Sequence, residues 1–370
     1  MEKGAVEFIT NSTSILHFSN RDVLDRIFVV CLISLISVCN VLMGCELNLH
    51  VVLSTIKRPV APAIGFFTQF AIMPLLAYSI AIFVLSSKGM HLLALGLFVT
   101  GCSPGGGASN YWTVLLGGNT NLSITMTFCS TIAALVMMPL WIKLLGTRLI
   151  KAVAPTLTIH IPYSKIVASL FTLIVPLFIG LIIAKYKPHW AIRARKVFVT
   201  TFIISVLIVL IIFGVAINLW LFKLITWPIL LAGLLLPWCG FMFGCFTSIL
   251  LAQDPPDVTA IAIETGVQNT GIAIMLLKLT FPGTDSDIAS LLPITVACFT
   301  PAPLLFGYAI HTLIKRLKEK RVKPGLCPAD SSRSPLAKNE EEEVQQNSST
   351  GNSDDDESDR IEIVCPTTAL

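Results

Sequence analysis

Glu264 is a carboxylate that lies far inside a long apolar stretch of the sequence, within the segment 263–271. A charge near the middle of a bilayer costs about 2.5–3.5 kcal/mol on insertion scales unless it finds partners. Glu264 follows Asp257 by seven residues, which is roughly 10 Å along a helix. Gly266 and Gly271, together with nearby amide and hydroxyl side chains, indicate a helix that is interrupted at membrane depth. Such interruptions are tolerated where the freed backbone lines a polar cavity, so this segment predicts an ion site.

The alternative for Glu264 is a structural carboxylate paired with a neighbouring helix. The sequence offers no Lys, Arg or His at comparable depth. Lys278 lies further along the same apolar stretch, where its long side chain is expected to snorkel to the interface. An ionised carboxylate without a basic partner favours a bound cation.

A second apolar stretch contains an unusual run of small residues, Pro104-Gly105-Gly106-Gly107, followed by Ser109 and Asn110. Close packing of small residues between membrane helices explains single glycines. It does not explain three glycines behind a proline, because that run cannot maintain a regular helix interior. The pattern therefore predicts a second broken helix.

Further oxygen-bearing side chains lie in two other apolar stretches. Ser123 and Thr127 are four residues apart and so share one helix face. Gln69 is an isolated amide between aromatic residues, which taken alone predicts a hydrogen bond between helices. A hard monovalent cation is expected to require several oxygen ligands, by the logic that governs Ca²⁺ and Mg²⁺ sites.

The composition determines which elements must position these residues. Of the 370 residues, 54% are hydrophobic and only 13% are charged, whereas soluble proteins carry about 25% charged residues. The apolar residues fall in blocks long enough to cross a bilayer, which needs about 20 residues. The chain is therefore expected to be an all-α polytopic membrane protein that lies in a lipid bilayer. Nine spans are predicted, at 25–47, 60–85, 91–117, 121–145, 164–186, 197–222, 225–252, 257–281 and 288–314.

The two broken spans are the third and the eighth in this series. Because they are five spans apart, they cross the membrane in opposite directions. This is the arrangement that inverted repeats produce when interrupted helices meet at a midplane site.

The distribution of basic residues predicts the orientation, since cytoplasmic loops carry more Lys and Arg. The prediction places the C-terminus in the cytoplasm and the leader 1–24 outside, where the sequon at Asn11 is available for glycosylation. Residues 25–314 form the predicted transporter domain, and the loop 146–163 is an exception to the charge rule. The basic residues assigned to the cytoplasm are Lys57, Arg58, Lys185, Lys187, Arg193, Arg195, Lys196, Lys315, Arg316, Lys318, Lys320, Arg321 and Lys323.

The C-terminal segment 315–370 is expected to be a cytoplasmic tail. From about residue 324 it is rich in Ser, Glu and Asp, a composition that predicts disorder. Its last residues, Thr368-Ala369-Leu370, fit a peptide captured by a PDZ domain through strand addition.

Several function classes are not supported by the sequence. The six histidines fall in predicted loops or at span edges, which disfavours a histidine proton relay. No pairing of nucleophile and base, zinc-protease motif or phosphate loop is present, so neither an enzyme nor a cofactor is predicted, and no nucleic-acid partner is expected. The cysteines lie mostly inside spans without disulfide or zinc spacing, which predicts apolar packing.

With these motifs in view, the membrane region 25–314 resembles the sodium/bile acid cotransporter family. Three segments in order carry the resemblance: Ser103 to Asn110, Asn121 to Thr127, and Glu264 to Asn269. The resemblance implies two broken helices that cross, a core domain that holds the ion sites, and a panel domain. Transport would occur by alternating access, as one domain moves against the other.

The resemblance also implies two sodium ions as co-transported ligands. Asn269 and Gly107 are expected to contribute to substrate binding. Residues 270–273 differ from those of the vertebrate bile acid carriers, so the identity of the transported solute stays open. The first sodium site would comprise Ser109, Asn110, Ser123, Thr127 and Glu264. The second would comprise Gln69, Glu264 and Gln268 with the main chain near Thr265 and Val267.

The leading functional hypothesis is a plasma-membrane symporter that carries an amphipathic organic anion, of bile acid or steroid-conjugate type, together with sodium. Three alternatives remain. One is a sodium symporter for a different solute, such as a small organic acid. Another is a receptor or signalling member of the same fold that does not transport. The third, a channel, is disfavoured because no repeated filter or charged ring is present.

Overall fold

The computed structural model describes residues 26–153, 163–193, 224–281 and 283–321, and these residues form helices without a β-strand. The first helix is Arg26–Glu46. The α-helices that follow are α2 (Leu49–Ile56), α3 (Val60–Phe67), α4 (Met73–Ile80), α5 (His91–Gly101), α6 (Ala108–Leu115), α7 (Thr120–Trp141), α8 (Thr147–Val153), α9 (Tyr163–Tyr186), α12 (Trp227–Leu250), α13 (Pro255–Gly266), α14 (Thr270–Thr280), α15 (Gly283–Phe299) and α16 (Pro301–Arg321). Shorter π-helical turns are η1 (Thr68–Ile72), η2 (Ala81–Leu85) and η4 (Ile142–Gly146), and η3 (Ser86–Lys88) is a 3₁₀ turn.

Several of these elements join into helices that are long and apolar enough to cross a membrane. Within the described ranges there are six: Arg26–Glu46, Val60–Lys88, Thr120–Lys151, Ile166–Tyr186, Trp227–Leu250 and Gly283–Leu317. They agree with six of the predicted spans, and the described residues are those of a multi-pass helical membrane protein. The predicted span 197–222 lies outside the described residues.

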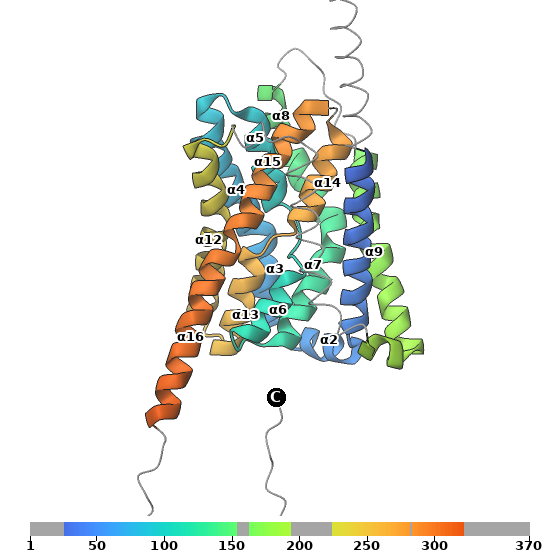
Figure 1. Cartoon of the computed structure of the whole chain (residues 1–370), viewed down its shortest axis with the longest axis vertical. Helices are drawn as coiled ribbons and strands as arrows, with labels where there is room; N and C mark the ends of the chain where they lie inside the picture. The colour runs from blue at the N-terminus through green and yellow to red at the C-terminus, as the bar shows by residue number, and fades with distance from the viewer. Residues whose placement is uncertain (1–25, 154–162, 194–223, 282, 322–370) are drawn as a thin grey trace, which may run out of the picture. The chain divides into compact units, whose positions relative to one another are not determined.

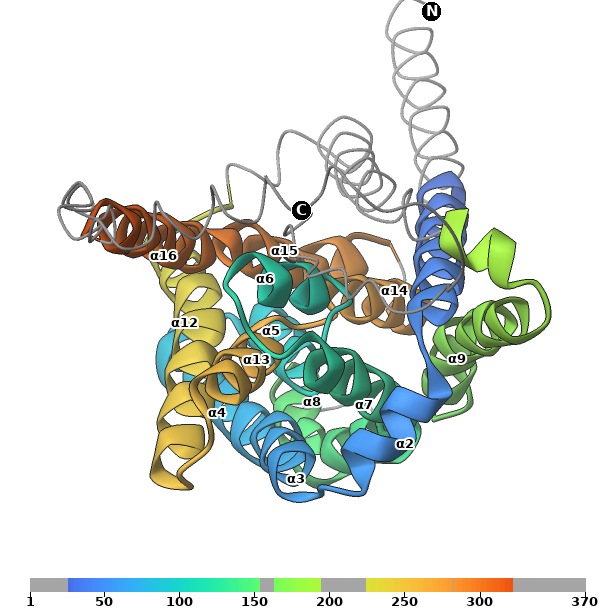
Figure 2. The ribbon, with the colours of Figure 1, turned by 90° about the horizontal axis from the view of Figure 1, so that it is seen from below.

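The remaining two predicted spans are each built from two short helices. α5 and α6 occupy the stretch predicted as 91–117, and α13 and α14 occupy the stretch predicted as 257–281. In Figure 1, α5 and α14 lie in one half of the bundle, and α6 and α13 lie in the other half. Both predicted helix breaks are therefore present. Viewed along the bundle, α5 and α13 lie at its middle (Figure 2).

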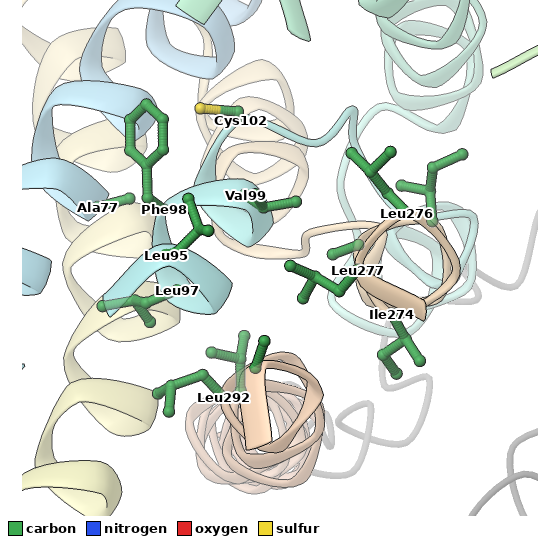
Figure 3. Packing of buried hydrophobic residues seen from close by; sticks show 14 of the residues in the cluster. Ala77, Leu95, Leu97, Phe98, Val99, Cys102, Ile274, Leu276, Leu277 and Leu292 are labelled. Atoms are coloured by element: carbon green, nitrogen blue, oxygen red, sulfur yellow. The ribbon is translucent and has the colours of Figure 1, made fainter. Parts of the chain in front are cut away.

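A large apolar cluster fixes α5 and α14, one half of each broken helix. Phe98 of α5, Leu277 of α14 and Leu292 of α15 belong to this cluster and are fully buried. Figure 3 shows how the apolar side chains of α4, α5, α14 and α15 pack together. α5 approaches α15 so closely that a Cβ at Gly96 would overlap the carbonyl oxygen of Ala289.

The chain divides into two units, Met1–Leu313 and Ile314–Leu370. Only residues up to Arg321 are described in the second unit. The extracellular leader 1–24 with its sequon at Asn11, the greater part of the tail and the PDZ motif at 368–370 all lie outside the described residues. These assignments remain predictions.

Candidate functional site

Glu264 lies near the end of α13, and its side chain is only 1% exposed. The helix ends at Gly266 because Val267 adopts an extended backbone conformation. α14 begins three residues later, and the side chain of Asn269 caps it by accepting a hydrogen bond from the N–H of Ile272 (3.2 Å). This cap satisfies one of the free donors at the helix start.

The two breaks lie against each other and exchange main-chain hydrogen bonds. The N–H of Gly106 donates to the carbonyl of Val267 (2.9 Å), and the N–H of Asn269 donates to the carbonyl of Pro104 (3.0 Å). Gly105 and Gln268 thereby form an isolated antiparallel bridge. Each break supplies hydrogen-bond partners for main-chain N–H and carbonyl groups that the other break leaves free. A helix break at membrane depth requires such partners, because no water is available there.

Three hydroxyl groups surround one oxygen of Glu264. Ser109 of α6 donates to Glu264 Oε2 at 2.5 Å, and Thr127 and Ser123 of α7 donate to it at 3.0 and 3.4 Å. The side-chain carbonyl of Asn110 lies 2.9 Å from Ser123 Oγ and 3.2 Å from Thr127 Oγ1. All four side chains are at most 2% exposed. We call these five residues the Glu264 cluster.

The Glu264 cluster contains more oxygen lone pairs than protons. Each hydroxyl carries one proton. Thr127 Oγ1 lies within hydrogen-bonding distance of Ser109 Oγ, Asn110 Oδ1 and Glu264 Oε2, so it can donate to only one of them at a time. Several lone pairs therefore face one another, and such an arrangement of hard oxygen donors suits a cation.

The other carboxylate oxygen of Glu264 lies close to the first break. Glu264 Oε1 is buried and accepts no hydrogen bond from the described residues. It lies so near Gly105 that a Cβ there would overlap it, which explains why this position takes glycine. Glu264 forms no ion pair with any described Lys, Arg or His, and the same part of the chain contains no group of three His, Cys, Asp or Glu residues that could hold a metal ion.

The residues predicted for the second sodium site form a separate hydrogen-bonded group. Gln69 Nε2 donates to Gln268 Oε1 (2.9 Å) and to the carbonyl of Ser103 (2.8 Å). Gln268 Nε2 donates to the carbonyl of Thr265 (2.7 Å). The carbonyl of Val267 is taken by Gly106, and no hydrogen bond links this group directly to Glu264. We call Gln69, Thr265, Val267 and Gln268 the crossing group.

The two residues predicted to contact substrate lie beside the crossing. Asn269 is half-buried and its side-chain oxygen caps α14. Gly107 immediately precedes α6, and a Cβ there would meet Met43 Sδ at an ordinary contact distance of 3.5 Å. The first helix therefore reaches the same region as Gly107.

The structure adds three hydroxyl residues that the sequence analysis did not single out. Thr113 Oγ1 lies 2.8 Å from the carbonyl oxygen of Ser109 and 3.2 Å from Ser123 Oγ, and it can donate to either. Ser130 Oγ accepts from the N–H of Gly105 (3.3 Å), and Thr68 Oγ1 lies 2.7 Å from Thr265 Oγ1. Spacing could have identified two of them, because Thr113 and Ser130 lie one turn after Ser109 and Thr127 on the same helix faces.

The prediction that Lys278 snorkels to the interface is wrong. Its side chain is 2% exposed and forms an ion pair with Asp287, whose side chain is 7% exposed. The ammonium group also lies 5.6 Å from the ring centroid of Phe28. The physical reason is that Asp287, one turn into α15, provides a counter-charge inside the protein that the sequence analysis did not consider.

Comparison of the sequence with known proteins shows the family of this chain. The sequence model of the Sodium Bile acid symporter family matches residues 32–223, which include Gln69, Ser109 and Thr127. The chain belongs to this family. The resemblance seen in the sequence is thereby confirmed, and the chain is grouped with transporters and not with enzymes.

The relatives in this family include named cotransporters. The P3 protein of Homo sapiens is 32% identical over 306 residues, which are 82% of this chain and 61% of that protein. The ileal sodium/bile acid cotransporter of Mus musculus is 31% identical over 258 residues, 70% of this chain and 71% of that protein. The hepatic sodium/bile acid cotransporter of Rattus norvegicus is 31% identical over 261 residues, 70% of each chain. This chain thus spans less than two thirds of the length of the human P3 protein.

Proposed function

We propose that this protein is a sodium-coupled symporter of amphipathic organic anions. The observation that carries the proposal is the Glu264 cluster: a buried carboxylate beside three hydroxyls and an amide oxygen, with no basic partner in the described part of the chain. A buried charge in a membrane requires compensation. A sodium ion that arrives with each transport cycle supplies it, and family membership supports sodium as the cation.

We assign the first sodium ion to the Glu264 cluster. Its oxygens come from α6, α7 and α13, so an ion bound there joins the inner halves of both broken helices to α7. The ion would replace the crowded hydroxyl contacts with metal–oxygen contacts.

We assign the second sodium ion to the crossing group with Glu264 Oε1. This oxygen accepts no hydrogen bond from the described residues, and it faces Gly105, which bridges to Gln268. Glu264 would then contact both ions, one through each carboxylate oxygen. The two ions are cargo, and no other cofactor is proposed.

The substrate class follows from charge and from the relatives. Two sodium ions with one monoanion move one net positive charge inward, worth about 2.3 kcal/mol per 100 mV of membrane potential. The relatives named as bile acid cotransporters support an amphipathic anion of bile acid or steroid-conjugate type. Asn269 and Gly107 are the proposed substrate contacts beside the crossing.

The proposed mechanism is alternating access between a core domain with the crossing helices and a panel domain. The antiparallel contact between the two breaks supports the inverted repeats, and the nine spans are proposed from the apolar blocks of the sequence. The distribution of Lys and Arg supports a plasma-membrane orientation with the N-terminus outside and the C-terminus in the cytoplasm.

The test is uptake of a labelled bile acid and a labelled steroid sulfate by cells that express the full chain, with sodium or choline outside. Uptake is expected only with sodium, and Glu264→Gln at equal surface expression is expected to abolish it. The matched control is Asp254→Asn, which removes an exposed carboxylate at the start of the same helix and is expected to leave uptake unchanged. Uptake that is indifferent to sodium, or that survives in Glu264→Gln, would contradict the proposal.

A further inference from the structure

Gln69 lies in a helix whose hydrogen-bond pattern is altered at that point. Between α3 and α4 the chain forms the π-helical turn η1, and the N–H of Met73 donates to the carbonyl of Thr68, five residues earlier. Such single wide turns are rare and often occur at functional sites. Here the wide turn contains the side chain that reaches both broken helices.

Pro74 removes one regular helical donor beside this wide turn. In a regular α-helix the N–H of residue 74 would donate to the carbonyl of Phe70. Proline has no N–H, so Phe70 loses that donor. Phe70 is 2% exposed, and a buried carbonyl that lacks its donor is costly.

A tryptophan from another span replaces the missing donor. The indole N–H of Trp141, the last residue of α7, donates to the carbonyl of Phe70 at 2.7 Å. The indole also packs against the large apolar cluster, so its position is fixed by neighbours on both sides. Phe70 directly follows Gln69, whose side chain is 1% exposed and bonds Ser103 and Gln268.

We propose that Trp141 is a positioning residue for the second sodium site. Its indole N–H takes the place of the helical donor that Pro74 lacks, and it thereby stabilises the wide turn that directs Gln69 between the two breaks. The role rests on the proposed function, because Gln69 belongs to the crossing group assigned to the second sodium ion. α7 then serves both sites, with Ser123 and Thr127 near its start and Trp141 at its end.

The first measurement is sodium activation of uptake in Trp141→Phe, which retains an aromatic ring but lacks the N–H. Loss of one buried hydrogen bond is expected to raise the sodium concentration for half-maximal uptake about two- to tenfold. Maximal uptake at saturating sodium, and the substrate KM measured there, are expected to stay unchanged. Trp227→Phe is the matched control, because Trp227 is 74% exposed at the start of α12.

The second measurement is hydrogen exchange of the purified full chain over the peptide 66–78, which does not depend on transport. Trp141→Phe is expected to exchange faster there than Trp227→Phe. Pro74→Ala is expected to shift the sodium concentration for half-maximal uptake as well. The double variant Pro74→Ala with Trp141→Phe is expected to shift this concentration little further than the single variants do, since both changes act on the Phe70 carbonyl.

The outcomes separate this inference from the proposed function. An unchanged sodium half-saturation in Trp141→Phe, while Glu264→Gln abolishes uptake, would overturn the positioning role alone. Sodium-independent uptake by the unaltered chain would overturn the proposed function. Faster exchange at 66–78 would then still support the role of Trp141 in stabilising the turn, and unchanged exchange would overturn it.

Discussion

Among the residues that the structure describes, two carboxylates are buried, Glu264 and Asp287, and their charges are compensated in different ways. Glu264 is 1% exposed and is surrounded by hydroxyl groups. Asp287 is 5% exposed and forms an ion pair with Lys278, which also faces the ring of Phe28. Both residues face the same cost of removing a charge from water. Of the two, only Asp287 has an ammonium group beside it among the described residues.

Under the proposed function, this difference separates a structural charge, Asp287, from a functional one, Glu264. The counter-charge of Asp287 is the side chain of Lys278, which belongs to the same chain and is therefore present in every state of the folded protein. This ion pair joins α14 to α15. Glu264 is surrounded by neutral oxygens, and in the proposed function a cation that arrives and leaves compensates its charge. Removing one partner of a buried pair is strongly destabilising, whereas removing a charge that awaits a mobile ion is expected to affect function more than folding.

The largest effect on stability is expected from Asp287→Asn. This change leaves the buried ammonium of Lys278 without its carboxylate, and breaking such a pair costs about 3–5 kcal/mol. Thermal unfolding of the purified protein, monitored by size-exclusion chromatography, measures this loss of stability. Asp285→Asn, an exposed position two residues earlier, is expected to leave the unfolding temperature unchanged. A decrease as small as that of the control would show that Asp287 is not structural.

Replacing both members of the pair is expected to restore most of that loss. Lys278→Met together with Asp287→Leu puts apolar side chains of similar volume where the ions were, an exchange that is often neutral or stabilising. Sodium activation of uptake in this double variant is expected to match that of the parent. A shifted sodium half-saturation would mean that the pair takes part in ion coupling, and the contrast with Glu264 would then weaken.

An intermediate effect, on sodium affinity, is expected from Thr127→Val. This change removes the Thr127 hydroxyl that donates to Glu264 and nearly retains the shape of the side chain. Hydrogen bonds to charged groups contribute about 1.5–3 kcal/mol, so sodium affinity is expected to fall about ten- to hundredfold. Thr127→Ser is expected to retain most of the affinity. Thr131→Val is the control, because Thr131 lies one turn later and its hydroxyl donates to the carbonyl of Thr127 within the same helix. Equal sodium half-saturation in both valine variants would exclude Thr127 from the site.

The positions of the helix breaks could be predicted from sequence because they depend on local chemistry. Glycine and proline in Pro104–Gly107 and the glycines around Glu264 determine where a helix can continue. The oxygen chemistry of Ser109, Thr127 and Glu264 indicated a common cation site, and the family resemblance assigned them to one ligand set, although three separate helices contribute these residues. The π-turn at Gln69 was missed, because the donor to its Phe70 carbonyl, Trp141, lies 71 residues from Phe70 in the chain. The Lys278–Asp287 pair was missed because Asp287 lies just outside the predicted span 288–314 and was not considered as a partner for Lys278.

The smallest effect on stability is expected from Glu264→Gln in sodium-free buffer. An amide has nearly the same shape as the carboxylate and removes a buried charge, so the free energy of unfolding is expected to stay the same or to rise by about 1 kcal/mol. Sodium at ten times its dissociation constant is expected to stabilise the parent by about 1.4 kcal/mol and the variant not at all. Unfolding temperatures in sodium and in potassium buffer measure both effects. If Glu264→Gln instead lost as much stability as Asp287→Asn, Glu264 would be a second structural carboxylate, and the cation that compensates it would have no role in the transport cycle.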